Sequence, residues 1–266
     1  MGATRPAAVA GFFYPGDPAA LAAEVASYLA AARGDGAKPA PKAIIAPHAG
    51  YIYSGPIAAS VYARLAPLRG RVRRVVLAGP AHRVYVAGAA IPNVDAFSSP
   101  LGAVRLDRAA LEAIAKLAFV EVSDRAHAQE HSLEVHLPFL QSVLGDFSLV
   151  PVVVGDASPD EMGALFDRVW GGDETLVVVS SDLSHYLPYR AAQDRDTRTA
   201  QAIVGLEARL IPDEACGAAP INGLLRAARA RNLAAELVDL RNSGDTAGDR
   251  SRVVGYGAFA FAPNHG

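Results

Sequence analysis

Short runs of β-branched and other apolar residues alternate along this chain with longer stretches in which apolar positions recur at helical spacing. Several of the short runs contain no polar residue, which is typical of strands that are buried on both faces of a sheet. Strands are predicted at residues 43–46, 74–79, 86–91, 149–155, 175–181, 235–240 and 253–261.

Helices are predicted between many of these strands. Asp17-Pro18 is an N-cap followed by proline at the first helical position, and Ser158-Pro159 begins a second helix in the same way. Other helical stretches cover residues 55–65, 107–118, 191–210 and 220–232. The alternation predicts an α/β fold, a single domain over residues 1–266 with a central, mostly parallel or mixed sheet covered by helices.

Composition narrows the classes of function. The formal net charge is −2, from 25 basic and 27 acidic residues, so no electrostatic attraction to nucleic acid or to an anionic membrane is expected. The apolar runs are far shorter than the roughly 20 residues of a membrane span, and the first residues lack a signal-peptide pattern. Cys216 is the only cysteine, which excludes an intrachain disulfide and favours a cytoplasmic location.

Histidines follow three of the predicted strands. His48 and His82 each come after an apolar strand and a proline, and the strand at 175–181 leads into Asp182 and His185. Ligands of open α/β sheets bind outside the carboxyl ends of the strands, where such loops converge. A single histidine in this position is more often an ordinary loop residue, but three of the seven histidines in equivalent positions predict a site.

Five segments together resemble the Memo family, which includes the bacterial AmmeMemoRadiSam system protein B. They are APHAGYIYSG, LAGPAHR, the EHSLEVHLP segment at 130–138, VVVSSDLSHY and CGAAPINGLL, and the similarity runs from about Ala10 to Phe261. The family is similar to class III extradiol (LigB-type) dioxygenases, which use non-haem iron. The resemblance therefore implies a LigB-type, dioxygenase-like fold.

The resemblance also implies roles for individual residues. It places a metal on His48, His82 and Cys216, and a proton-accepting histidine at His185 with Asp182 beside it. Cys216 has the alternative of being a buried, inert side chain, and Asp182 that of a turn residue or helix N-cap. Two imidazoles and a thiolate form a soft ligand set, which suits copper, zinc or thiolate-bound iron. The resemblance to enzymes that use non-haem iron makes iron the first expectation for the metal.

Further residues are expected around the ligand. Phe13 and Tyr53 would form an aromatic wall, although some relatives carry tryptophan at position 13. Glu130 and His131 are expected to line the site and, with Glu134, to form hydrogen bonds near the cleft.

Three functions follow from these expectations. The first is metal-dependent redox or dioxygenase-type activity on a small aromatic or planar ligand. The second is a non-catalytic module that binds a small ligand or a (phospho)peptide in the same cleft. The third is a zinc hydrolase built on HAQEH at 127–131, which matches the H-x-x-E-H pattern. The resemblance also implies pathway partners, an AMMECR1-like protein and a radical-SAM enzyme.

Overall fold

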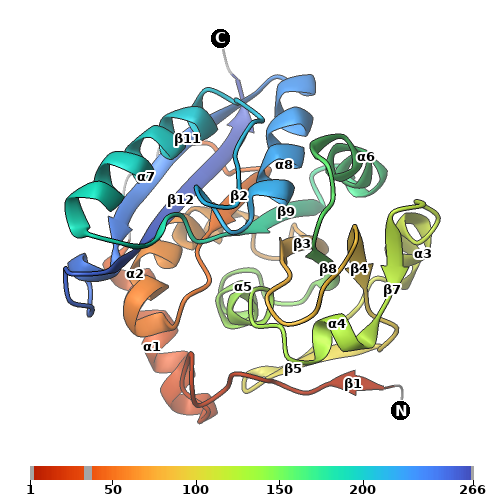
Figure 1. Ribbon diagram of the computed structural model, residues 1–266. Helices are drawn as coiled ribbons and strands as arrows, with labels where there is room; N and C mark the ends of the chain where they lie inside the picture. Colours follow the sequence, from red (N-terminus) through yellow and green to blue (C-terminus); the bar gives the residue numbers. More distant parts are fainter. Residues whose placement is uncertain (1–2, 33–37, 265–266) are drawn as a thin grey trace.

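The computed structural model describes residues 3–32 and 38–264, and a long mixed sheet runs through it (Figure 1). Within the described residues this sheet has nine strands, in the order β10-β12-β2-β9-β3-β8-β4-β7, and β11 pairs with β12 at one end. The strands are β2 (Ala43–Ala46), β3 (Arg74–Pro80), β4 (Ala89–Ile91), β7 (Val120–Val122), β8 (Ser148–Val154), β9 (Thr175–Ser180), β10 (His185–Leu187), β11 (Leu233–Asn242) and β12 (Val253–Pro263).

The four central strands, β2, β9, β3 and β8, are parallel to one another. The sheet becomes mixed at both sides, since β12 is antiparallel to β2 and β4 is antiparallel to β8. Every residue of β2 and β9 is buried, as their unbroken apolar sequences predict. A smaller sheet joins β1 (Thr4–Arg5), β5 (Ala96–Ser99) and β6 (Gly102–Arg105).

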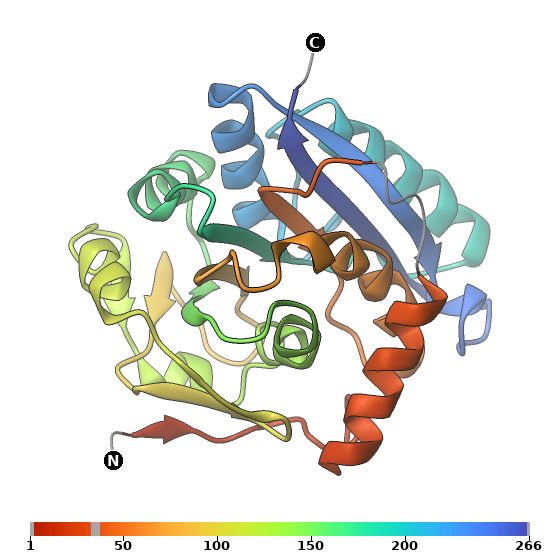
Figure 2. The ribbon, with the colours of Figure 1, turned by 180° about the vertical axis from the view of Figure 1, so that it is seen from behind.

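Helices cover both faces of the large sheet. In Figure 1, α7 and α8 lie in front of it, and α7 contacts β11 and β12. Seen from behind in Figure 2, α1 and α2 are in front, and α2 contacts β2, β11 and β12. The helices are α1 (Pro18–Ala31), α2 (Tyr51–Tyr62), α3 (Arg108–Ile114), α4 (Asp124–Ala128), α5 (Leu137–Leu144), α6 (Pro159–Val169), α7 (Tyr189–Val204) and α8 (Ala218–Ala230), with 3₁₀ turns at Ala63–Leu68, Glu134–His136 and Ser243–Asp245. In the described part of the chain, none of these helices is both long and apolar enough to cross a bilayer.

The predicted α/β class and mixed sheet are confirmed, and each predicted strand overlaps an observed one. Both predicted helix starts are also confirmed, because Asp17 caps α1 and Ser158 forms a capping box with Glu161 at the start of α6. The strand predicted at 86–91 begins only at Ala89. The carbonyls of Val86 and Gly88 instead accept hydrogen bonds from Asp156 and Gly155, in the loop after β8.

A buried ion pair joins the N-terminal segment to the chain that precedes α5. The Arg5 guanidinium donates to Glu134 Oε2 at 2.7 Å and to the carbonyls of His127 and Glu130. The same carboxylate accepts hydrogen bonds from the backbone amides of residues 8 and 9 and from the Tyr14 hydroxyl at 2.6 Å. Because Arg5, Tyr14 and Glu134 are buried, the carboxylate fixes residues 5–14 against the segment 127–134.

Two histidines outside the strand ends belong to the core. His127 donates from Nε2 to the Ala90 carbonyl at 3.0 Å, and His136 Nδ1 lies 2.9 Å from the Tyr62 hydroxyl. Burial lowers the pKa of His127 to about 4 and that of His136 to about 3. Both side chains are therefore neutral at pH 7 and serve the fold.

Replacement of Glu134 by alanine is expected to destabilise the protein by about 3–5 kcal/mol, because the buried Arg5 charge loses its partner. Urea unfolding measures the change in free energy. The matched control is Glu121→Ala on the exposed strand β7, which should change stability by no more than about 0.5 kcal/mol. Equal effects of the two substitutions would contradict a structural role for the ion pair.

Stability is expected to fall as the pH falls from about 6.5 towards 4. In that window the unfolded chain protonates His127 and His136, whose ordinary pKa is 6.5, whereas the folded chain keeps them neutral. Unfolding free energies measured between pH 7.5 and 4.5 should show this slope, and His136→Leu should make it shallower. A wild-type free energy that does not change over this range would refute the assignment.

Candidate functional site

The chain leaves β2, β3 and β9 at one edge of the sheet and places polar side chains there. These strands are neighbours in the order β2-β9-β3 and run parallel, so the loops after them start side by side. His48 follows β2, His82 follows β3, and Asp182 follows β9. The imidazole rings of His48 and His82 lie 5.1 Å apart between centroids, so the two histidines predicted to share a site are neighbours.

His48 is buried and held in one tautomer. Its Nδ1 lies 2.6 Å from the Ser180 hydroxyl oxygen, and that hydroxyl donates its only hydrogen to the Ser132 carbonyl. Nδ1 must therefore carry the proton and donate, which leaves Nε2 with a free lone pair. Burial, followed by the neighbouring histidines, holds the pKa of His48 well below its usual range, so the ring is neutral.

Glu130 holds His82. Its carboxylate accepts a hydrogen bond from His82 Nδ1 at 2.9 Å and others from the backbone amides of His82 and Ser132. Burial alone would raise the pKa of Glu130, but these hydrogen bonds outweigh burial and lower it to about 2. A carboxylate that accepts from Nδ1 leaves Nε2 of the ring free, which is the usual arrangement behind a metal-bound histidine.

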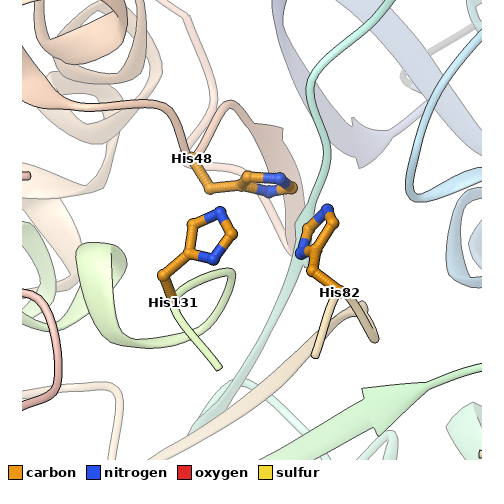
Figure 3. Close-up of side chains that lie close together, drawn as sticks. All are labelled: His48, His82 and His131. Carbon is orange, nitrogen blue, oxygen red and sulfur yellow. The ribbon is translucent and has the colours of Figure 1, made fainter. Parts of the chain in front are cut away.

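His131 completes a group of three imidazoles (Figure 3). Its ring stacks on His82 with centroids 4.7 Å apart, and it meets the His48 ring edge-on at 5.5 Å. One nitrogen from each of the three rings lies within 4.8 Å of the others, so the group could hold a metal ion. Burial lowers the pKa of His131 to about 4, which keeps this ring neutral and able to donate a lone pair at pH 7.

Cys216 lies beside one member of this group, His48, but is not itself part of the group. Its sulfur is 3.4 Å from His48 Nε2 and accepts a hydrogen bond from the Asp182 amide at 3.3 Å. Gly217 makes this approach feasible, because a Cβ there would lie 2.6 Å from the Ser180 carbonyl oxygen. Burial and the nearby Asp182 carboxylate raise the pKa of the thiol to about 12, so without a cation beside it the sulfur keeps its proton.

Asp182 and His185 differ in exposure. Asp182 is buried and accepts a hydrogen bond from the His48 amide at 2.8 Å, and burial raises the pKa of its carboxyl to about 6. His185 is exposed, at the start of β10. The structure thus makes Asp182 a support of the His48 backbone and leaves His185 accessible to a ligand.

The three imidazoles, Asp182 and His185 line one cleft of about 710 Å³, a volume typical of small-molecule sites, whereas Cys216 and Glu130 lie behind its lining. Phe13 and Tyr53 line it, at the positions expected for an aromatic wall, and the Phe13 ring lies 4.8 Å from that of His131. The further lining residues are His48, Ala49, Gly50, His82, His131, Asp182, His185, Tyr186, Ser243, Ala247, Gly248, Asp249, Arg252, Val254 and Tyr256.

Two expectations change with the geometry. His131 was expected only beside the site, but its ring belongs to the group of imidazole donors. One feature of the sequence could have predicted this position of His131: it directly follows Glu130, whose carboxylate binds His82. The residues of HAQEH do not lie on one face of a helix, because α4 ends at Ala128. His127 is hydrogen-bonded to the Ala90 carbonyl in the core. The geometry needed for an H-x-x-E-H zinc site is therefore absent from this segment.

Comparisons with known proteins agree over nearly the whole chain. A MEMO1 family protein of Ignicoccus hospitalis is 36% identical over 282 residues, which cover 97% of this chain and 98% of that protein. A MEMO1 family protein of Aquifex aeolicus is 36% identical over 269 residues, with the same two coverages.

The crystal structure of the uncharacterized protein JW3007 from Escherichia coli K12 aligns with a TM-score of 0.47. It is 15% identical, and the alignment covers 80% of this chain and 98% of that one. This likeness is too low to indicate a function.

The family model described as "Memo-like protein" matches residues 5–260. With this match and the identity to full-length relatives, the chain belongs to the Memo family.

Proposed function

We propose that this protein binds a redox-active metal ion, iron in the first place, and carries out dioxygenase-type chemistry on a small aromatic or planar ligand. The convergence of three imidazoles on one cleft, with the Cys216 sulfur beside His48, carries the proposal. His48, His82 and Cys216 are the proposed ligands, and His131 would face the same ion, because one of its nitrogens lies within 4.8 Å of those of His48 and His82. Copper and zinc are alternatives for this donor set.

The tautomers support this assignment. A metal ion needs the lone pair of a neutral imidazole, and both His48 and His82 use Nδ1 as a hydrogen-bond donor and keep Nε2 free. The core histidines His127 and His136 also bond through one ring nitrogen only, but they do not line the cleft, whereas His48 and His82 do. Here one nitrogen of each ring is anchored and the other is left for a ligand.

The separation of the donors supports the inclusion of sulfur. Bonds from such ions to nitrogen and sulfur measure about 2.0–2.3 Å, so two ligands of one ion stand roughly 3–4 Å apart. His48 Nε2 and Cys216 Sγ are 3.4 Å apart. The amide of Asp182 already donates to this sulfur, which would stabilise a thiolate once a cation has displaced the proton.

A bound iron or copper ion would supply electron transfer and polarise an oxygen atom of the ligand. The protein's own groups then provide proton transfer and exclusion of water. The exposed imidazole of His185 would accept a proton from a phenolic hydroxyl, because it lines the cleft and imidazole is the commonest general base in enzymes. Phe13 and Tyr53 would hold the planar ring.

A second candidate is ligand binding in this cleft without chemistry. The composition of the imidazole group favours it, because the group includes no carboxylate, whereas many non-haem iron oxygenases use two histidines and one carboxylate. A LigB-type dioxygenase activity and this binding function would both use the same cleft. They differ in whether oxygen is consumed when metal and ligand are both bound.

Metal content tests the proposed ligands. His48→Ala and Cys216→Ala should each lose most of the iron that the wild type retains after anaerobic loading and desalting, measured by elemental analysis. His185→Ala is the control and should retain wild-type iron. Full retention in Cys216→Ala together with loss in His131→Ala would replace the sulfur by the third imidazole. Retention in all of these variants would refute the site.

Oxygen uptake tests the chemistry. Iron-loaded wild type is expected to consume oxygen with a catechol panel, and His185→Gln is expected to lower the rate about 10²–10⁴-fold while it keeps its iron. An oxygen electrode measures both. No uptake by iron-loaded wild type with any catechol would favour binding without chemistry.

A further inference from the structure

Tyr186 adopts a backbone conformation that tyrosine rarely takes, on the wall of the cleft. In the antiparallel pair of β10 and β12, His185 is opposite Val254 and Leu187 is opposite Val253, so Tyr186 is an extra residue in β10. Its φ is +57°, in the left-handed region that usually belongs to glycine at such a bulge. The ring is 62% exposed, so no packing in the core explains the tyrosine.

The bulge directs Tyr186 to an arginine. The guanidinium of Arg252 lies over the Tyr186 ring, 5.2 Å from its centroid, and both side chains line the cleft that holds the three imidazoles. Stacking on an aromatic face holds the planar guanidinium in place and leaves its N–H edge available for a ligand. A strained residue at a ligand site is a reason to look for function there.

Arg252 has no anionic partner within the described residues. No salt bridge or side-chain hydrogen bond of Arg252 is found there, whereas Arg250 interacts with Gly244 and Asp245. The nearest acidic residue in sequence, Asp249, accepts a hydrogen bond from the Ser251 amide at 2.7 Å, within its own turn. The cleft thus contains one arginine whose charge is not used by the fold.

We propose that the cleft selects aromatic ligands that carry a carboxylate, which pairs with Arg252 while the ring packs against Tyr186. A guanidinium matches a carboxylate with two parallel hydrogen bonds. Arg252 is the only lysine or arginine among the cleft residues, and Asp182 and Asp249 also line the cleft, so a singly charged group suits it better than a doubly charged phosphoryl group. This inference rests on the proposed function only for the aromatic nature of the ligand.

Calorimetric titration of metal-free protein with 3,4-dihydroxybenzoate and with its neutral amide tests the proposal. Wild type should bind the acid about tenfold or more tightly than the amide. Arg252→Gln should bind the two equally, with the affinity for the amide unchanged. The control is Arg250→Gln, which removes a nearby arginine that lies over Tyr189 and should keep the preference.

Tyr186→Gly separates recognition from folding. Glycine relieves the strained φ, so stability in urea should be equal to or higher than that of the wild type, while affinity for both ring compounds should fall. If Tyr186 instead stabilised the fold, Tyr186→Gly would lower the free energy of unfolding.

Several outcomes would overturn the proposal: no binding of the acid, equal affinity of acid and amide in wild type, or a preference that survives Arg252→Gln. Phenyl phosphate bound in place of the acid would assign the arginine to a phosphoryl group and also overturn it. Because the titrations use metal-free protein, their outcome does not depend on whether the protein binds iron. Failure of either experiment leaves the other interpretable.

Discussion

The carboxylate of Glu130 is the constraint on which the arrangement of the site depends. It is almost completely buried, yet it accepts three hydrogen bonds, two from His82 and one from the amide of Ser132. A buried anion without these donors would be too costly to keep, so the loop after β3 and the turn after α4 must meet around it. That meeting stacks the His131 ring on His82 and brings both to His48.

The segment around Glu130 is itself fixed from the other side. Glu134, four residues later, binds Arg5, Tyr14 and two amides of the N-terminal segment, and Arg5 also reaches the Glu130 carbonyl. Phe13, carried by that segment, therefore lies against His131. Two buried carboxylates thus position the aromatic wall and the imidazoles together, and their hydrogen bonds connect the fold directly to the proposed chemistry.

The side chains on the two sides of the cleft are held in position by different interactions. On the imidazole side, hydrogen bonds to Ser180 and Glu130 hold the rings of His48 and His82, and burial keeps His48 and His131 neutral. On the opposite side, Tyr186 and Arg252 are exposed, and a bulge sets the ring's direction at the expense of an unfavourable backbone conformation. The proposed selection of a planar anion depends on both sides: an imidazole group that could hold a metal ion, and an exposed tyrosine and arginine.

The sequence by itself determined the α/β class, the central strands and the strand-end positions of His48, His82 and Asp182, because buried strands and helix caps are encoded in local patterns. Short elements such as β10 and α4 have too few residues for any period, and the sequence did not predict them. Only the tertiary structure decided that His131 joins the imidazole group and that Tyr186 meets Arg252. These pairs are far apart in sequence or depend on one residue of register, so the sheet edge and its long-range hydrogen bonds had to form first.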